Sequence, residues 1–392
     1  MRTWSDSPFR AVVQRHDVPA THVIAEDNGE STQVHEIAGQ PGWLAKLYRR
    51  PLTDAAAATL QTLVYLPTVM SQQDRDLVDR CVSWPVARIC DGPYIVGVVM
   101  AKAPDRFYAR LHTLSGRTEA PRPLPLDWMV TADAACIKRG IQPANMVVRS
   151  RAMTELLQVG ALFARHDVVY ADWSYSNAFW EQGTGAVFII DMDTSGIGTR
   201  EWIESPEWED PLYPETSRPA LTVHSDRYKL AVLTVRCLTG ERRDPLAAHQ
   251  ALLSRLGNNP FHTAVGRALT AAQPAERPTP QDLFAALDHW MGTAPGELGD
   301  VGTTPSGASN NVTGSIDLRA RIPAPVTLPP RPPSHPPVQP VHLEQPVESV
   351  PRAETLPAVP PPSTRRLGKA ATTTAVIVCL VFVLIIIALA SG

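Results

Sequence analysis

The stretch YADWSYSNAFWEQGTGAVFIIDMDTSG, residues 170–196, decides how this chain is interpreted. It places Asp172, Asn177 and Asp191 on either side of a turn and the apolar run VFII. Two carboxylates and an amide at this spacing suit a magnesium ion and the orientation of a hydroxyl for phosphoryl transfer. Asp and Asn also favour ordinary turns, so the rest of the chain must decide between a site and a plain hairpin.

Short apolar segments precede this stretch. Residues 23–24, 34–37 and 43–48 are separated by turn residues and predict three strands. Residues 96–100 form an apolar run that suits a central strand. Lys46 interrupts the otherwise apolar strand 43–48, where a buried ammonium is costly unless it is paired. The side chain either extends to the surface or reaches phosphate oxygens.

Helical patterns dominate the second half of the folded region. Residues 53–70 predict one early helix, with Thr53 or Asp54 as its N-cap. Residues 127–166 predict helix with a break at 140–143, and residues 225–240 predict a mostly apolar helix closed by Gly240. The order of strands first and helices second predicts an α+β fold with a small β-rich part and a larger helical part.

The bulk properties exclude some classes of function. The net charge of the 392-residue chain is −3, which gives no case for a nucleic-acid partner. The N-terminus has no apolar segment of the kind found in secretory signals. The cysteines form no C-x-x-C pair, so we expect buried thiols in a reducing compartment; they are Cys81, Cys90, Cys136, Cys237 and Cys379.

Residues 292–369 differ in composition from what precedes them. They are first rich in Gly, Ser, Thr and Asn and then dense in Pro, as in LPPRPPSHPP. Such a segment cannot bury enough apolar surface to fold, and we expect a disordered linker biased towards polyproline II. It acts either as a spacer or as a ligand for proline-binding modules.

The final residues, 370–392, carry no charge and contain the run VIVCLVFVLIIIALA. This length predicts a transmembrane helix. Arg365, Arg366 and Lys369 precede it, and basic residues favour the cytoplasmic side of a span. We therefore expect a single-pass tail anchor in the cell membrane, with residues 1–369 in the cytoplasm.

Several motifs together resemble the bacterial, eukaryotic-like serine/threonine protein kinases over residues 20–290. Lys46 in WLAKLY is similar to the strand lysine that pairs with ATP phosphates. Asp172 and Asn177 match the catalytic-loop pattern D-x-x-x-x-N, and Asp191 in IIDMD matches the metal-binding Asp of D-F-G.

Three later motifs extend the resemblance. The segment SPEWEDP, residues 205–211, resembles the A-P-E motif. Asp226 is similar to the Asp of the buried helix that supports the family's catalytic loop. Arg277 in ERPTPQDL looks like the arginine of a closing R-P-T motif, and the resemblance implies a buried ion pair with Glu207.

The resemblance implies ATP and Mg²⁺ as ligands and assigns roles to individual residues. Asp172 would orient the substrate hydroxyl, and Lys46 would neutralise phosphate charge. Asn177 and Asp191 would hold magnesium. The nucleotide contacts would come from Gly29 and Val34 of the glycine-rich loop, from Lys46, and from backbone groups of Met100 and Lys102 facing adenine.

The sequence also departs from the family. Only Gly29 remains of the three loop glycines, and the acidic partner of Lys46 is missing from the first helix, where Gln61 or Gln72 would be weak substitutes. The His-Arg pair before the catalytic Asp is replaced by Tyr170-Ala171, which argues against activation by loop phosphorylation. Asp193 replaces the Gly of D-F-G, as in divergent bacterial members and in small-molecule phosphotransferases.

We therefore expect a two-lobed, protein-kinase-like fold: a lead-in at 1–20, an N-lobe at 21–104 and a C-lobe at 105–291, followed by the linker and the anchor. The expected function is a membrane-anchored serine/threonine protein kinase. One alternative is a pseudokinase, a nucleotide-binding scaffold at the membrane. A second is a small-molecule phosphotransferase.

Overall fold

The computed structural model of the protein describes residues 4–27, 31–113, 115–203 and 205–293. They all belong to one compact unit, Met1–Ala308. The predicted membrane span and nearly all of the predicted linker lie outside the described residues. Within the described part of the chain, no helix is long and apolar enough to cross a membrane.

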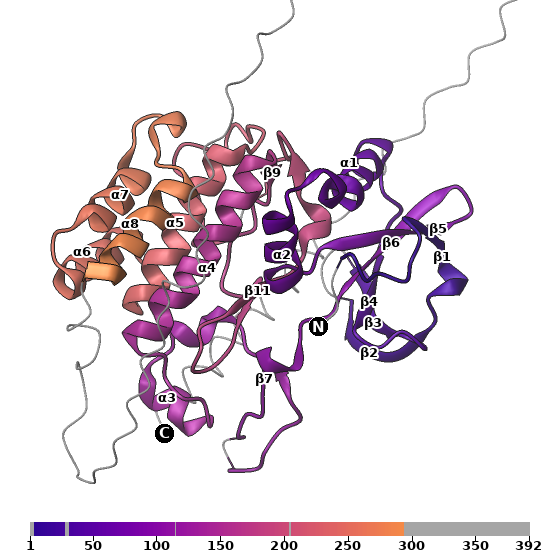
Figure 1. The fold of residues 1–392 in the computed structure, drawn as a ribbon, viewed down its shortest axis with the longest axis horizontal. Helices are drawn as coiled ribbons and strands as arrows, with labels where there is room; N and C mark the ends of the chain where they lie inside the picture. The colour runs from indigo at the N-terminus through magenta and orange to yellow at the C-terminus, as the bar shows by residue number, and fades with distance from the viewer. Residues whose placement is uncertain (1–3, 28–30, 114, 204, 294–392) are drawn as a thin grey trace, which may run out of the picture. The chain divides into compact units, whose positions relative to one another are not determined.

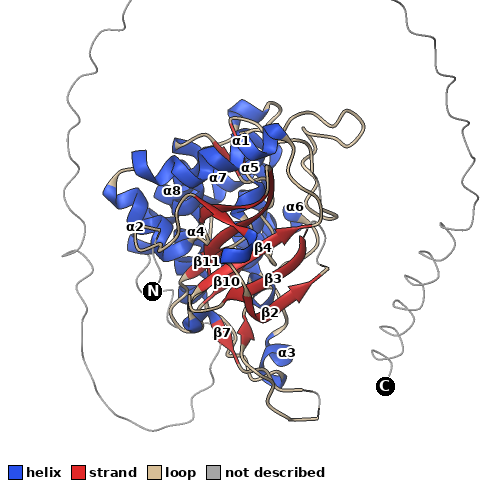
Figure 2. Cartoon of the chain, turned by 90° about the vertical axis from the view of Figure 1, so that its right-hand side faces the viewer, coloured by secondary structure: helices blue, strands red, loops and turns tan. Residues whose placement is uncertain are grey.

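The chain folds as a mixed α+β protein, with a β-rich N-terminal sheet followed by a helical C-terminal part (Figure 1). Six strands form the sheet in the order β1-β5-β6-β4-β3-β2. Their bounds are β1 Val12–Gln14, β2 Ala20–Glu26, β3 Ser31–Ile37, β4 Trp43–Tyr48, β5 Pro85–Asp91 and β6 Tyr94–Ala101. Strands β2, β3 and β4 lie side by side in Figure 2. The four strands predicted from apolar runs are therefore confirmed as β2, β3, β4 and β6.

The expected lead-in at residues 1–20 contains a strand, β1, in its second half. Strand β1 joins the sheet edge in parallel with β5, with Val13 opposite Ile89. Val13 is buried, and Phe9 meets the ring of Trp43 edge-on at 5.8 Å between centroids. A three-residue strand is too short for a periodic pattern to reveal it, and its stability comes from these tertiary contacts.

Strand β4 has two different faces because successive side chains point to opposite sides. Trp43, Ala45 and Leu47 are buried in the apolar cluster on one side of the sheet. Lys46 lies on the other side, towards α1 and the helical part. Gly97 of β6 allows these strands to approach, since a Cβ on it would lie 2.4 Å from the backbone oxygen of Lys46.

Two helices connect β4 to β5. Helix α1, Asp54–Tyr65, begins as predicted at Thr53, whose hydroxyl accepts the N–H of Ala56. Helix α2, Gln72–Cys81, was not predicted, because its polar sequence resembles a loop. Its buried side, Asp74, Leu77, Val78 and Cys81, faces the protein, and the helix packs on α4.

The remaining strands of the described residues are short and form two-stranded pairs. They are β7 Tyr108–Ala109 paired with β8 Arg122–Pro123, β9 Val168–Val169 paired with β12 Gly196–Ile197, and β10 Ala178–Trp180 paired with β11 Val187–Ile189. The 3-10 helices are η1 Arg15–Asp17, η2 Leu66–Val69, η3 Asp105–Phe107, η4 Leu126–Met129, η5 Met192–Thr194 and η6 Pro274–Glu276.

The helical part is built around α4, Met146–Arg165, and α5, Val223–Thr239. The other members are α3 Asp133–Lys138, α6 Pro245–Leu256, α7 Pro260–Thr270 and α8 Pro280–Thr293. Helix α4 packs on both α5 and α8, and Gly160 is the point of closest approach: a Cβ there would lie 2.3 Å from Leu230 and 3.3 Å from Pro280. The predicted helix end at Gly240 is confirmed, with φ of 74°.

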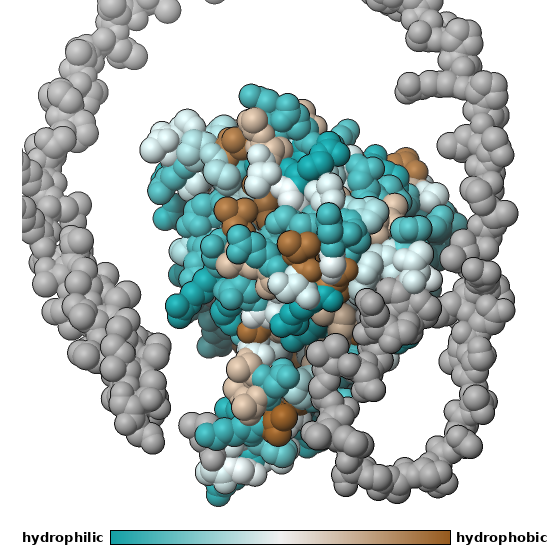
Figure 3. Space-filling view, turned by 90° about the vertical axis from the view of Figure 1, so that its left-hand side faces the viewer, coloured by the Kyte–Doolittle hydropathy of each residue, from teal (hydrophilic) through white to brown (hydrophobic). Residues whose placement is uncertain are grey.

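The described part of the chain has a mostly polar surface and buried thiols. The molecular face in Figure 3 is mainly hydrophilic, with hydrophobic residues in separate small groups. The four described cysteines, Cys81, Cys90, Cys136 and Cys237, are free and buried, as expected. Cys379 lies outside the described residues.

Candidate functional site

The side chain of Lys46 joins the sheet to the helical part of the protein. Its ammonium lies 3.0 Å from Asp191 Oδ1 and 3.0 Å from Asp193 Oδ1. Burial favours the neutral amine, but the charges of Asp193 and Asp191 outweigh burial and raise the pKa of Lys46 above its ordinary value. Lys46 is therefore a buried, paired cation, which excludes the alternative that it extends to the surface.

The two carboxylates differ strongly in their exposure. Asp191 follows β11 and adopts a left-handed backbone conformation, with φ of 56° and ψ of 38°. Its side chain remains 39% exposed, whereas the side chain of Asp193 in η5 is fully buried. Residues other than glycine seldom adopt the left-handed conformation seen at Asp191, and one that does is held there by the surrounding structure. Asp191 can therefore still meet a ligand, and Asp193 cannot.

Asp172 and Asn177 occupy a loop that is tied to Asp191. The side-chain amide of Asn177 donates to the backbone oxygen of Asp172 at 3.1 Å, and the N–H of Ile190 donates to the oxygen of Asn177 at 3.0 Å. These bonds place the loop beside the residue that precedes Asp191. Hydrogen bonds therefore join the Asp172–Asn177 loop to the segment that leads into Asp191.

Asp226 in α5 fixes the backbone of this loop. Its carboxylate accepts the N–H groups of Tyr170 and Ala171, each at 2.8 Å. Burial raises the pKa of Asp226 to about 6, although the two backbone bonds oppose the rise. Ala171 has φ of 62°, so the loop turns sharply just before Asp172. The expected support of the loop by Asp226 is confirmed.

Two further cations hold the same loop. Lys229 of α5 donates to the oxygen of Ala171 at 3.1 Å. Arg200 donates to the oxygen of Tyr170 at 2.5 Å and to the Thr194 hydroxyl at 3.1 Å. Neither residue was predicted. Both act on backbone oxygens, which leave no side-chain signature in the sequence.

The two glutamines considered as partners for Lys46 lie elsewhere. Gln61 accepts a hydrogen bond from Arg88 at 3.0 Å, and Gln72 donates to Asp76 at 2.7 Å. Helix α1 nevertheless packs against η5, the turn that carries Asp193. The acidic partner of Lys46 that the family resemblance places on the first helix is absent there, and Asp193 of η5 bonds to Lys46 instead.

Two of the residues expected to contact a nucleotide share the face of the sheet that carries Lys46. Val34 is the cross-strand partner of Lys46 and shares its face of the sheet. Met100 is the partner of Leu44 on that same face. The N–H of Lys102 donates to the backbone oxygen of Gly42 at 2.9 Å, and its side chain pairs with Glu36. Gly29 lies outside the described residues.

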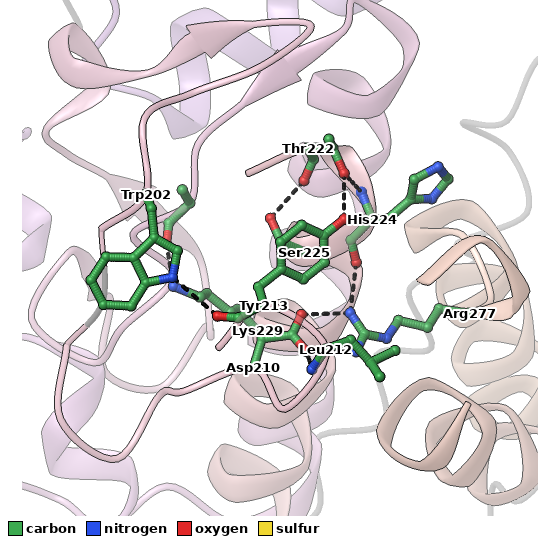
Figure 4. Close-up of polar contacts among 10 residues, drawn as sticks. Trp202, Asp210, Leu212, Tyr213, Thr222, His224, Ser225, Lys229 and Arg277 are labelled. Atoms are coloured by element: carbon green, nitrogen blue, oxygen red, sulfur yellow. Dashed lines mark hydrogen bonds and ion pairs between the residues drawn. The ribbon is translucent and has the colours of Figure 1, made fainter. Parts of the chain in front are cut away.

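The predicted ion pair of the closing motif has a different acidic partner. Arg277 pairs with Asp210 through two 2.6 Å bonds, and both side chains are almost completely buried (Figure 4). Glu207 is exposed and has φ of 72°. The turn at Glu207 directs that side chain to solvent and brings Asp210 inward three residues later.

The donor set of the site fits a magnesium ion. Asp191 offers a carboxylate that is open to solvent, and Asn177 uses its amide nitrogen in the loop, which leaves its oxygen as a ligand. Burial raises the pKa of Asp191, as do Asp193 and Asp172, against the effect of Lys46. A cation at this position would relieve that excess of negative charge. No set of three His, Cys, Asp or Glu side chains in the described residues is arranged as a complete metal site.

Two comparisons with known proteins found no match. No protein-family model matches the chain. No curated protein matches it either.

Proposed function

We propose that this protein is an ATP-dependent serine/threonine protein kinase with a two-lobed, kinase-like fold. The observation that carries the proposal is the ion pair between Lys46 of the N-terminal sheet and Asp191 of the stretch 170–196. It brings a cation for phosphate oxygens next to a carboxylate for magnesium, from segments 145 residues apart. The Asp172–Asn177 loop beside them supplies the third group that the chemistry needs.

Each residue has a defined task in this proposal. Asp172 accepts or orients the proton of the attacking hydroxyl, and Lys46 neutralises charge on the transferred phosphate. Asn177 and Asp191 hold magnesium, which when bound offsets negative charge on the nucleotide. Asp226 keeps the backbone of Tyr170 and Ala171 fixed, so that Asp172 does not need to be positioned during the reaction.

The proposed location is the cell membrane, on its cytoplasmic side. The support is the uncharged run 370–392, its basic flank and the Pro-rich segment before it, all of which come from the sequence. The segment 292–369 would give the catalytic part reach from the membrane and would offer sites to proline-binding modules.

A second candidate function is a pseudokinase that binds nucleotide without efficient transfer. One observation favours it: Lys46 bonds directly to Asp191, so the ammonium competes with a metal ion for that carboxylate. The absence of an acidic residue on the buried side of α1 points the same way.

An experiment separates the two candidates. The full chain in mild detergent is incubated with Mg²⁺ and γ-labelled ATP, together with the variants Asp172→Ala and Asp191→Ala. Asp91→Ala, at an exposed residue with a surface ion pair, is the matched control. A kinase labels itself in the wild type and the control, and each site variant loses at least a hundredfold in rate.

Other outcomes decide against the kinase. Nucleotide-dependent thermal stabilisation without labelling supports the scaffold. If neither labelling nor nucleotide binding occurs with Mg²⁺ present, both candidate functions are refuted.

A further inference from the structure

We propose that Asp193 is the positioning residue for Lys46, and that it does what an acidic residue on α1 would otherwise do. The proposal rests on the proposed function for its purpose, but not for its evidence. That evidence is the bond of 3.0 Å between Lys46 Nζ and Asp193 Oδ1 in the part of the protein that is shielded from water.

The two partners of Lys46 are not equivalent. The side chain of Asp193 is fully buried, while that of Asp191 is 39% exposed. An ion pair in a shielded place is stronger and is screened less by salt than a pair near the surface. Asp193 therefore holds Lys46 permanently, whereas Asp191 can exchange the ammonium for a ligand.

This difference resolves the competition at Asp191. If Asp191 were the sole partner, its transfer to a metal ion would leave Lys46 as a buried, uncompensated cation, which is strongly unfavourable. With Asp193 in place, Lys46 keeps one charged partner throughout. Asp191 is then free to act on magnesium while the ammonium stays in position for phosphate oxygens.

Among the described residues, these two carboxylates are the ion-pair partners of Lys46. The acidic residue of α1, Asp54, lies at the exposed start of the helix. The turn η5, which carries Asp193, packs against α1. An acidic group thus approaches the ammonium from the turn beneath the helix.

The second oxygen of Asp193 strengthens this assignment. Within the described structure, Asp193 Oδ2 is buried and has no hydrogen-bond partner. A buried carboxylate oxygen without a hydrogen-bond partner is costly and uncommon. Its charge is compensated chiefly by Lys46, so each of the two residues depends on the other.

The test measures Lys46 directly and requires neither ATP nor a substrate. The full chain is treated with an amine-acylating reagent at pH 9, and the rate of acylation at each lysine is followed by peptide mass spectrometry. Lys102, which pairs with Glu36, serves as the internal reference. The variants are Asp193→Asn and Asp191→Asn. The control is Asp74→Asn, which weakens a different partly buried ion pair, with Arg165.

Asp193→Asn should raise the acylation rate of Lys46 at pH 9 at least tenfold relative to Lys102, because the side chain is no longer held in the shielded position beside Asp193. Asp191→Asn should raise it less than threefold, and Asp74→Asn should leave it unchanged. Equal effects of Asp193→Asn and Asp191→Asn, or no effect of Asp193→Asn, would overturn the proposal.

A second measurement tests the pairing if Asp193→Asn is too unstable for the acylation experiment. The double variant Lys46→Met with Asp193→Asn removes the buried cation together with its partner, so its urea midpoint should lie above that of Asp193→Asn alone. A lower midpoint contradicts the pairing. If Lys46 behaves as proposed but the wild type never transfers phosphate, the kinase function fails and the pair remains.

Discussion

Asp210 and Arg277 form a two-bond ion pair in the interior of the helical part, with both terminal nitrogens of Arg277 2.6 Å from a carboxylate oxygen. The pair ties the segment before α5 to the turn before α8. Arg277 also donates to the oxygen of His224 and lies over the ring of Tyr228. Its position therefore depends on two other parts of the chain, the segment at Asp210 and helix α5.

We expect Asp210→Asn or Arg277→Met to lower the free energy of unfolding by about 3–5 kcal/mol, because either change leaves a buried charge without its partner. The double variant should lose less than the sum of the two. Urea unfolding measures these values. Glu207→Gln is the control, and an equal loss in that variant would show that the pairing is wrong.

The stability contribution of Asp226 should depend on pH. Its pKa is about 6 in the folded protein against an ordinary value of 3.8, so the folded state binds more protons than the unfolded state between pH 4 and 6. Stability from this group therefore falls as the pH rises through that window. The variant Asp226→Asn does not titrate there. The difference in the free energy of unfolding, variant minus wild type, should therefore rise by roughly 2–3 kcal/mol between pH 4 and pH 7.

Thermal unfolding of wild type and Asp226→Asn at several pH values provides the measurement. The difference between the two proteins should change below pH 6 and level off above pH 7. Parallel curves across the whole range would contradict the raised pKa.

Gly160→Ala should destabilise the helical part by about 1–3 kcal/mol, because the added methyl group meets Leu230 and Pro280 in a packed core. Gly292→Ala in α8 is a matched control, since a Cβ there has open space around it. Alanine should be neutral or slightly stabilising at that helical position. Chemical denaturation of both variants tests this, and equal midpoints would refute the close approach.

Gly97→Ala should displace β4 at Lys46, because its Cβ would lie 2.4 Å from the backbone oxygen of that residue. We expect amide hydrogen exchange in β4 and β6 to become at least tenfold faster, while β2 at the far edge of the sheet changes little. Unchanged exchange in β4 would mean that the strands adjust without cost.

The sequence predicted elements whose signals are local. The strand 43–48 follows from a short apolar segment after a turn, the start of α1 from the Thr53 cap, and the end of α5 from Gly240 in the left-handed region. Lys46, Asp172, Asn177 and Asp191 were proposed as site residues because their spacing resembles a known pattern. The structure brings Lys46 to Asp191 and keeps Asp172 and Asn177 in one loop.

Pairing between distant residues could not be predicted in the same way. Asp193 was identified as a departure from the family pattern, yet its bond to Lys46 spans 147 positions and depends on how η5 packs under α1. The choice of Asp210 over Glu207 depends on a single left-handed residue. Neither choice leaves a periodic or compositional trace.

The edge strand β1 has a practical consequence for recombinant work. A shortened protein that begins at residue 21 would retain every residue of the candidate site but would uncover the backbone N–H and C=O groups of β5 that now pair with β1. An uncovered edge beside the apolar cluster of Trp43 is a template for intermolecular strand pairing. Such a protein should aggregate on concentration, and an affinity tag is better separated from Val12 by a flexible spacer.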